Sequence, residues 1–168
     1  MRPHSIARLS ILSVFIFIAP AAIAETLTIS SVLPFAEGSG ASPAVMNECQ
    51  LETKLPGFIK SYGKKNVTVT TDPLEEAEGK VLFIEFTHIL GTGGGGWSGP
   101  KTVSVRGELR DGEEVTGSFT ATRYSTGGAF GGFKGTCSIL GRCVKTLGRD
   151  IANWIKNPTM DAHLGDGG

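Results

Sequence analysis

The chain has 168 residues, among them 16 basic and 16 acidic side chains, so it carries no formal net charge. This balance, without a basic stripe, argues against nucleic acid as a partner. The length is that of one domain, which needs no bound metal or cofactor to build a core.

The first 24 residues have the pattern of a secretory signal peptide. Arg2 and Arg8 precede an apolar run over 9–20, and the small residue Ala24 marks a cleavage site. Removing both arginines leaves 14 basic against 16 acidic residues, a net charge of −2. We therefore expect a periplasmic or secreted protein without a transmembrane segment in its exported form, and no cysteine at the cleavage site to carry a lipid.

The exported part begins with a strand over 26–32 and a helix over 44–63, which we expect to kink or restart at Pro56. A short strand follows over 67–71. The next strand, 81–90, is the most apolar and is therefore expected at the centre of the sheet. The residues expected on its inward face are Leu82, Ile84, Phe86, His88 and Leu90.

Two alternating segments, 101–109 and 113–125, predict a β-hairpin. The residues expected to point inward, Val115 included, all carry odd numbers. Because residues that face each other across a hairpin point to the same side of the sheet, the loop must contain an odd number of residues. We therefore expect a three-residue loop, 110–112, with Gly112 in the left-handed conformation.

An apolar stripe over 137–156 predicts the last helix, which ends before Pro158. Gly141 and Gly148 lie beside the stripe and indicate a closely packed neighbour. Residues 157–168 are polar and are expected to form a flexible tail. Residues 25–156 thus predict a single α+β domain, an antiparallel or mixed sheet of about five strands with two helices on one face.

Three cysteines follow the signal segment, and an oxidising compartment favours one disulfide among them. Cys137 and Cys143 lie six residues apart in the predicted helix, too far to bridge. Cys49–Cys137 is the preferred pair and Cys49–Cys143 the next. Three buried thiols are the remaining alternative.

The segment 91–100, GTGGGGWSGP, partly matches three motifs: a dinucleotide fingerprint, a phosphate-binding P-loop and a nucleophile elbow. Each requires a helix directly afterwards, whereas Pro100 leads into a strand. The segment therefore predicts a hairpin tip. Its one large apolar residue, Trp97, either folds back on the sheet or contacts a partner.

A second glycine-rich segment, 126–136, stands between a strand and the start of a helix, the arrangement that holds anions. The alternative is that its glycines allow a tight crossover while Phe130 and Phe133 cover the edge of the core. The candidate anion-binding residues are Gly131, Gly132, Lys134, Gly135 and Thr136.

No set of catalytic residues can be assembled from this sequence. His88 lies on the apolar face of a strand, His163 lies in the tail, and Cys143 lies on a buried helix face where a thiol is inert. No metal-binding spacing occurs either. We expect no enzymatic activity, no metal and no cofactor.

Three stretches, 46–59, 97–109 and 125–155, resemble small exported proteins of Gram-negative bacteria that are classified as domains of unknown function. The order of elements is also similar to the αβ domains of the TolB amino-terminal region and the curli secretion lipoprotein. The resemblance implies an envelope location and an assembly role, and it supplies no catalytic residues.

Together these features predict a non-enzymatic binding or envelope-assembly module that contacts an envelope protein through Trp97. The alternative is a protein that binds a small anion or a phosphorylated ligand at the loop before the last helix.

Overall fold

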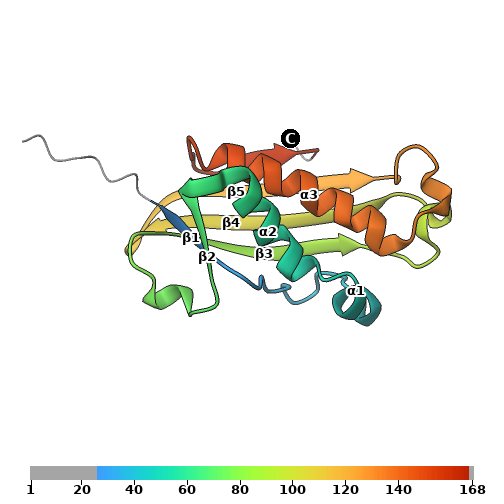
Figure 1. The fold of residues 1–168 in the computed structure, drawn as a ribbon, viewed down its shortest axis with the longest axis horizontal. Helices are drawn as coiled ribbons and strands as arrows, with labels where there is room; N and C mark the ends of the chain where they lie inside the picture. The colour runs from blue at the N-terminus through green and yellow to red at the C-terminus, as the bar shows by residue number, and fades with distance from the viewer. Residues whose placement is uncertain (1–25, 167–168) are drawn as a thin grey trace, which may run out of the picture.

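Six strands form one mixed sheet in the order β2-β1-β3-β4-β5-β6 (Figure 1). The computed structural model describes residues 26–166, so the predicted signal peptide, residues 1–24, lies outside the described residues. The strands are β1 (Leu27–Ser30), β2 (Val67–Thr70), β3 (Lys80–Leu90), β4 (Lys101–Asp111), β5 (Glu114–Ser125) and β6 (Ala162–Gly165). The three long strands β3, β4 and β5 are antiparallel, while β1 with its two neighbours and β5 with β6 are parallel pairs.

The main helices α2 and α3 lie across the same face of this sheet (Figure 1). The helices are α1 (Pro43–Glu48), α2 (Leu51–Gly63) and α3 (Thr136–Trp154), with short 3-10 turns η1 (Lys64–Asn66), η2 (Leu74–Glu76), η3 (Gly95–Ser98) and η4 (Gly131–Phe133). The core fills the space between helices and sheet, around fully buried residues such as Ile59, Phe86 and Leu140. The predicted α+β class is confirmed, with one more strand than expected.

The first helical region breaks at Gln50, between α1 and α2, and not at Pro56 as predicted. Gln50 adopts a left-handed conformation with φ 54°, which separates the two helices. Pro56 lies inside α2 and has no N–H to bond the carbonyl of Glu52. The Leu33 N–H donates to that carbonyl instead, at 3.0 Å, so the helix continues past the proline.

Two β-bulges correct the predicted facing of side chains. A register shift between Phe86 and His88 turns His88 and Leu90 outward and buries Ile89 in their place. A second shift, after Leu109, places one extra residue in β5, because Leu109 pairs with Gly117 and Arg110 with Val115. The extra residue lies in this bulge and not in the hairpin loop.

The β4–β5 hairpin itself is confirmed, but its loop is shorter than predicted. Asp111 pairs with Glu114, so the loop has two residues, and Gly112 is left-handed as expected, with φ 60°. Because the bulge absorbs the extra residue, Val115 is exposed and not inward as predicted.

The close packing predicted beside α3 occurs at Gly148 and not at Gly141. A side chain at Gly148 would overlap Phe58 of α2, whereas no atom lies within 4 Å of where one would point at Gly141. Gly148 therefore sets how near the two helices approach.

Residues 162–165, which the sequence places in a flexible tail, form the edge strand β6. It pairs in parallel with β5, from Phe119 opposite Ala162 to Thr122 opposite Gly165. Arg123 of β5 holds the end of the chain, with its guanidinium 2.7 Å from Asp150 of α3 and 2.5 Å from Asp166. The hydrogen bond to Asp150, supported by the charge of Asp166, raises the pKa of Arg123.

Candidate functional site

The two glycine-rich segments, 91–100 and 126–136, lie against each other at one end of the elongated molecule (Figure 1). The segment 91–100 joins β3 to β4 as predicted and contains only the short turn η3. The Gly96 N–H donates to the carbonyl of Lys134 at 3.0 Å. Thr136 joins both segments as well, since its hydroxyl donates to Thr92 O at 3.0 Å and accepts from Gly95 N at 3.2 Å.

Glycine is required at this contact because the two backbones touch. A side chain at Gly95 would overlap the carbonyl of Lys134, and one at Gly96 would overlap the carbonyl of Gly131. Gly95 and Gly96 therefore serve to bring the two loops together, whereas a side chain at Gly93 or Gly99 would meet no atom within 4 Å.

Lys101, the first residue of β4, holds the segment 91–100 through hydrogen bonds from the interior of the protein. Its side chain is fully buried, and its amine donates to the Ser98 hydroxyl at 2.8 Å and to Gly99 O at 3.0 Å. A buried lysine is rare and needs hydrogen bonds of this kind. The sequence reasoning missed this role, because Lys101 also fits the polar start of an ordinary strand.

The disulfide Cys49–Cys137 lies directly beside these loops. It joins the residue that follows α1 to the first turn of α3, across 88 residues, with the Cα atoms 4.8 Å apart. The preferred pairing is thus confirmed, and Cys143 is left as a buried free thiol. Because the bridge fixes the start of α3, it also fixes the loop that precedes it.

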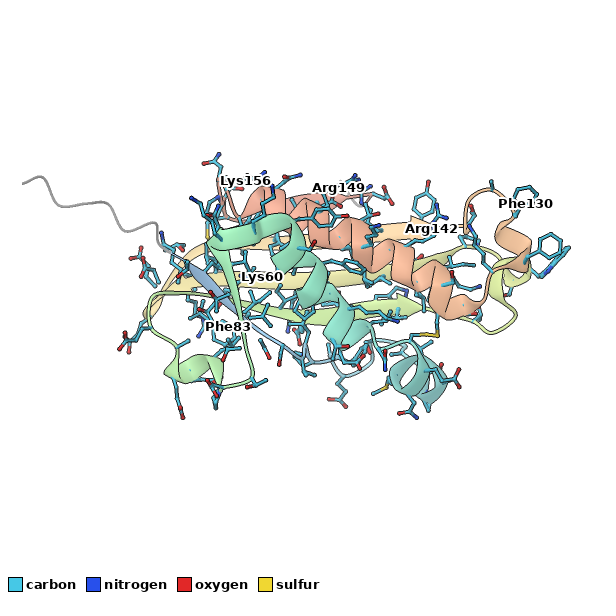
Figure 2. The ribbon with its side chains drawn as sticks, in the orientation of Figure 1. Lys60, Phe83, Phe130, Arg142, Arg149 and Lys156 are labelled. Atoms are coloured by element: carbon cyan, nitrogen blue, oxygen red, sulfur yellow. A yellow bond between two sulfur atoms is a disulfide. The ribbon has the colours of Figure 1, made fainter. Side chains whose placement is uncertain are left out.

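Three aromatic side chains project from the joined loops into solvent. Trp97 is 81% exposed, Phe130 81% and Phe133 84%. The rings of Trp97 and Phe133 meet edge to face, with centroids 6.4 Å apart. Figure 2 shows Phe130 at the extremity of the molecule, beyond the end of α3. We call Trp97, Phe130 and Phe133 the aromatic loop end.

This geometry corrects two expectations. Trp97 does not fold back on the sheet, because backbone contacts between the loops occupy the space beneath it. Phe130 and Phe133 do not cover the edge of the core. Exposed aromatics gathered in one place are unusual on a protein surface and mark contact surfaces.

Two cations, Lys134 and Arg142, lie beside the aromatic loop end. The segments 87–104 and 120–147 contain no Asp or Glu. Of their other basic residues, Lys101 is buried and Arg123 is paired with two aspartates, Asp150 and Asp166. Lys134 and Arg142 converge on one oxygen, the carbonyl of Gly127, at 2.7 and 2.9 Å. Within residues 26–166 neither of these two cations has a carboxylate partner.

The five candidate anion-binding residues are brought together, but much of their donor capacity is used within the loops. The Gly131 N–H donates to Gly128 O at 2.8 Å, and the Lys134 N–H donates to Gly131 O at 2.9 Å. The Thr136 hydroxyl is engaged with Thr92. Gly135 and Thr136 line a groove of about 460 Å³ that also contains Glu48, a carboxylate that would repel an anion.

His88, Cys143 and His163, the titratable residues singled out from the sequence, lie on β3, α3 and β6, and His163 also lines a trough on the other face of the sheet. His88 is exposed on β3, and His163 of β6 is hydrogen-bonded through Nδ1 to the Thr120 hydroxyl at 2.9 Å. Burial raises the pKa of the Cys143 thiol to about 11, so it stays protonated at neutral pH. Over the stretch 26–166 no three His, Cys, Asp or Glu side chains are placed to hold a metal ion.

The face of the sheet opposite the helices carries both polar and apolar side chains. A trough of about 960 Å³ runs over it and is floored by paired side chains, among them Glu85 with Arg106 and Glu108 with Arg110. The Arg110 guanidinium also stacks 5.0 Å above the ring of Phe83. Polar pairs of this kind are typical of the uncovered face of an antiparallel sheet.

No family model and no curated protein matches the chain. Solved structures do match. The chain is similar to PelC. Two PelC dodecamers from Paraburkholderia phytofirmans, one of them a point variant, are 17% and 16% identical with a TM-score of 0.46 for both. The matches cover 74% and 77% of this chain and 87% and 91% of those chains.

A third similar structure is protein XCC0632 from Xanthomonas campestris, of family DUF330. It is 13% identical with a TM-score of 0.44, and the match covers 78% of this chain and 83% of that one. All three likenesses are distant, and no residue role passes from those proteins to this chain. The resemblances to exported domain-of-unknown-function proteins, to TolB and to the curli lipoprotein stay predictions.

No helix in the described part of the chain has the length and apolar character needed to cross a bilayer.

Proposed function

We propose that this protein is a non-enzymatic binding module of the bacterial envelope that attaches to its partner through the aromatic loop end. The observation that carries the proposal is the exposure of Trp97, Phe130 and Phe133, each above 80%, on one ordered surface. Aromatic side chains dominate the binding energy of protein contact surfaces. The Cys49–Cys137 disulfide supports an oxidising compartment outside the cytoplasm.

Hydrogen bonds and the disulfide hold the two loops together within the chain itself, which suits a docking role. Gly96 is hydrogen-bonded to the second loop, Lys101 holds the first loop from inside, and the disulfide fixes the start of α3. A surface that is already ordered loses little conformational entropy on binding. The exposure of three large apolar side chains is thus explained if they become buried when the partner binds.

Site-specific photo-crosslinking in cells that export the protein tests this proposal. A diazirine amino acid at position 97 or 133 is expected to give a covalent adduct, because both side chains enter the contact. The matched control is position 62, where Tyr62 of α2 is only 36% exposed and lies outside both loops. Adducts that form equally at all three positions, or at none, would contradict the proposal.

The anion-binding alternative rests on Lys134 and Arg142, the two cations that share the Gly127 carbonyl. It predicts that phosphate raises the melting temperature of the wild type and not of a Lys134→Gln, Arg142→Gln double variant. Since several loop donors are engaged internally and Glu48 lines the adjacent groove, we place it second.

A further inference from the structure

We propose that the partner of the aromatic loop end is a lipid surface, the headgroup region of a bilayer that contains anionic phospholipid. This inference rests on the proposed function, because it names what the same surface binds. Two separate observations carry it, the kind of exposed side chain and the unpaired positive charge beside it.

The exposed side chains are those that favour the boundary between water and hydrocarbon. Trp97 contributes an indole, amphipathic because its N–H stays in the polar layer while its ring is apolar, and the two phenylalanines contribute purely apolar rings. The neighbouring strand ends add Leu90 and Tyr124, both exposed and both opposite Thr102 in the sheet. Two more exposed apolar side chains therefore lie at the end of the sheet from which the loops leave.

The aromatic loop end protrudes from the molecule, so its shape differs from that of a pocket or a flat interface. The loops lie at the extremity of the molecule, and Phe130 points away from its body (Figure 2). A protruding group of rings can enter a fluid headgroup layer without a complementary cavity. An attachment made by the side chains of two loops is shallow, because only their rings enter the interfacial layer.

The charge beside the rings matches a phosphate. Lys134 and Arg142 place two cations within 3 Å of the single Gly127 carbonyl oxygen, 2.7 and 2.9 Å away, and no carboxylate within 26–166 neutralises either. Figure 2 shows Arg142 on α3 close to the loop end. The phosphate of an anionic phospholipid would supply the missing negative charge while the rings enter the layer below it.

Vesicle flotation with the purified, oxidised protein tests the inference. The probes are vesicles of phosphatidylcholine alone and with about 30 mol % phosphatidylglycerol. We expect at least about tenfold more protein on the anionic vesicles, and less as salt is raised. Lipids brominated in the acyl chain should quench Trp97 fluorescence and not that of Trp154, which is buried.

Two sets of variants separate the rings from general hydrophobicity. A Trp97→Ala, Phe130→Ala, Phe133→Ala variant should lose at least about tenfold in vesicle binding. A Val32→Ala, Tyr62→Ala, Met160→Ala variant removes three other exposed apolar side chains and should bind as the wild type does. Lys134→Gln with Arg142→Gln should abolish the preference for anionic vesicles. Circular dichroism and melting curves verify that each variant is folded.

The outcomes distinguish this inference from the proposed function. Wild-type protein that does not float on anionic vesicles, or a triple loop variant that floats equally well, would overturn the lipid assignment. Inorganic phosphate that raises the melting temperature of the wild type, while anionic vesicles bind none of the protein, would overturn the assignment in favour of a free-phosphate site. If the crosslinker at position 97 then captures a protein, the proposed function stands alone, and if it captures nothing, both fail.

Discussion

A tryptophan lies near each end of α3, one buried and the other exposed. At the carboxyl end, Trp154 is 7% exposed and packs edge to face on Phe119, with ring centroids 4.8 Å apart. At the amino end, Trp97 rests on the loop before the helix and is 81% exposed. Glycine is adjacent in both places, so glycine alone does not decide whether a ring is buried.

What occupies the space above the glycine makes the difference. At Gly117 of β5 the Trp154 ring comes within about 3 Å of where a side chain would begin, so the missing side chain makes room for the ring. At Gly95 and Gly96 the space is filled by the backbone of the second loop, which leaves no room for Trp97 underneath. One end of the helix thus closes the core, and the other presents a contact surface.

The largest expected effect separates the two tryptophans directly. Trp154→Ala leaves a cavity against Phe119 and should lower the free energy of unfolding by about 3–5 kcal/mol. Trp97→Ala removes no buried contact and should change it by no more than about 0.5 kcal/mol. Equilibrium unfolding in guanidinium measures both, and similar losses would show that the comparison is mistaken.

The next effect is that of the disulfide, which supports the amino end of α3. Replacing Cys49 and Cys137 by alanine should cost about 2–4 kcal/mol, because the unfolded chain loses a long covalent loop. The expected accompanying change is greater proteolysis within 126–136 than within β4. Unchanged stability on reduction would mean that the disulfide does not contribute to the free energy of unfolding.

A smaller effect tests the contact between the loops. Gly96→Ala places a methyl group against the Gly131 carbonyl and should cost about 1–3 kcal/mol. Gly93→Ala is the matched control, since no atom lies within 4 Å of its added methyl group. Thermal unfolding compares the two variants. Equal melting temperatures would show that the two loops are not in contact in solution.

The smallest effect concerns Cys143, which lies on the buried face of α3 between the two ends. Its pKa is raised from an ordinary 9.0 to about 11 by burial, so above pH 9 the unfolded chain releases a proton that the folded chain keeps. Stability therefore falls as pH rises from 9 to 10, by about 1 kcal/mol more in the wild type than in Cys143→Ala. Parallel curves for the two proteins would mean that the thiol reaches solvent.

Most of the framework could be predicted because long elements carry long patterns. The period-two alternation of β4 and β5 and the apolar stripe of α3 each extend over many residues. Helix geometry excluded a Cys137–Cys143 bridge and left Cys49–Cys137 as the preferred of two pairings, which the structure confirms. The four residues of β6 are too few to show such a period, and its place depends on the crossover through α3.

The site was only half visible for a similar reason. The sequence singled out Trp97 and the second glycine-rich segment, but the meeting of the two loops depends on tertiary contacts such as Gly96 to Lys134. The pair of Lys134 and Arg142 on Gly127 is also non-local, since Arg142 lies almost two turns into α3. No periodicity along the chain encodes such a meeting.

The parallel edge strand β6 has a practical consequence for anyone who shortens this protein. A chain that stops at Trp154 keeps every helix, yet it leaves the outer side of β5 without a partner where β6 now lies. An uncovered strand edge of that kind invites pairing with other molecules and aggregation. Affinity tags are therefore better fused after Asp166 through a spacer than in place of the final residues.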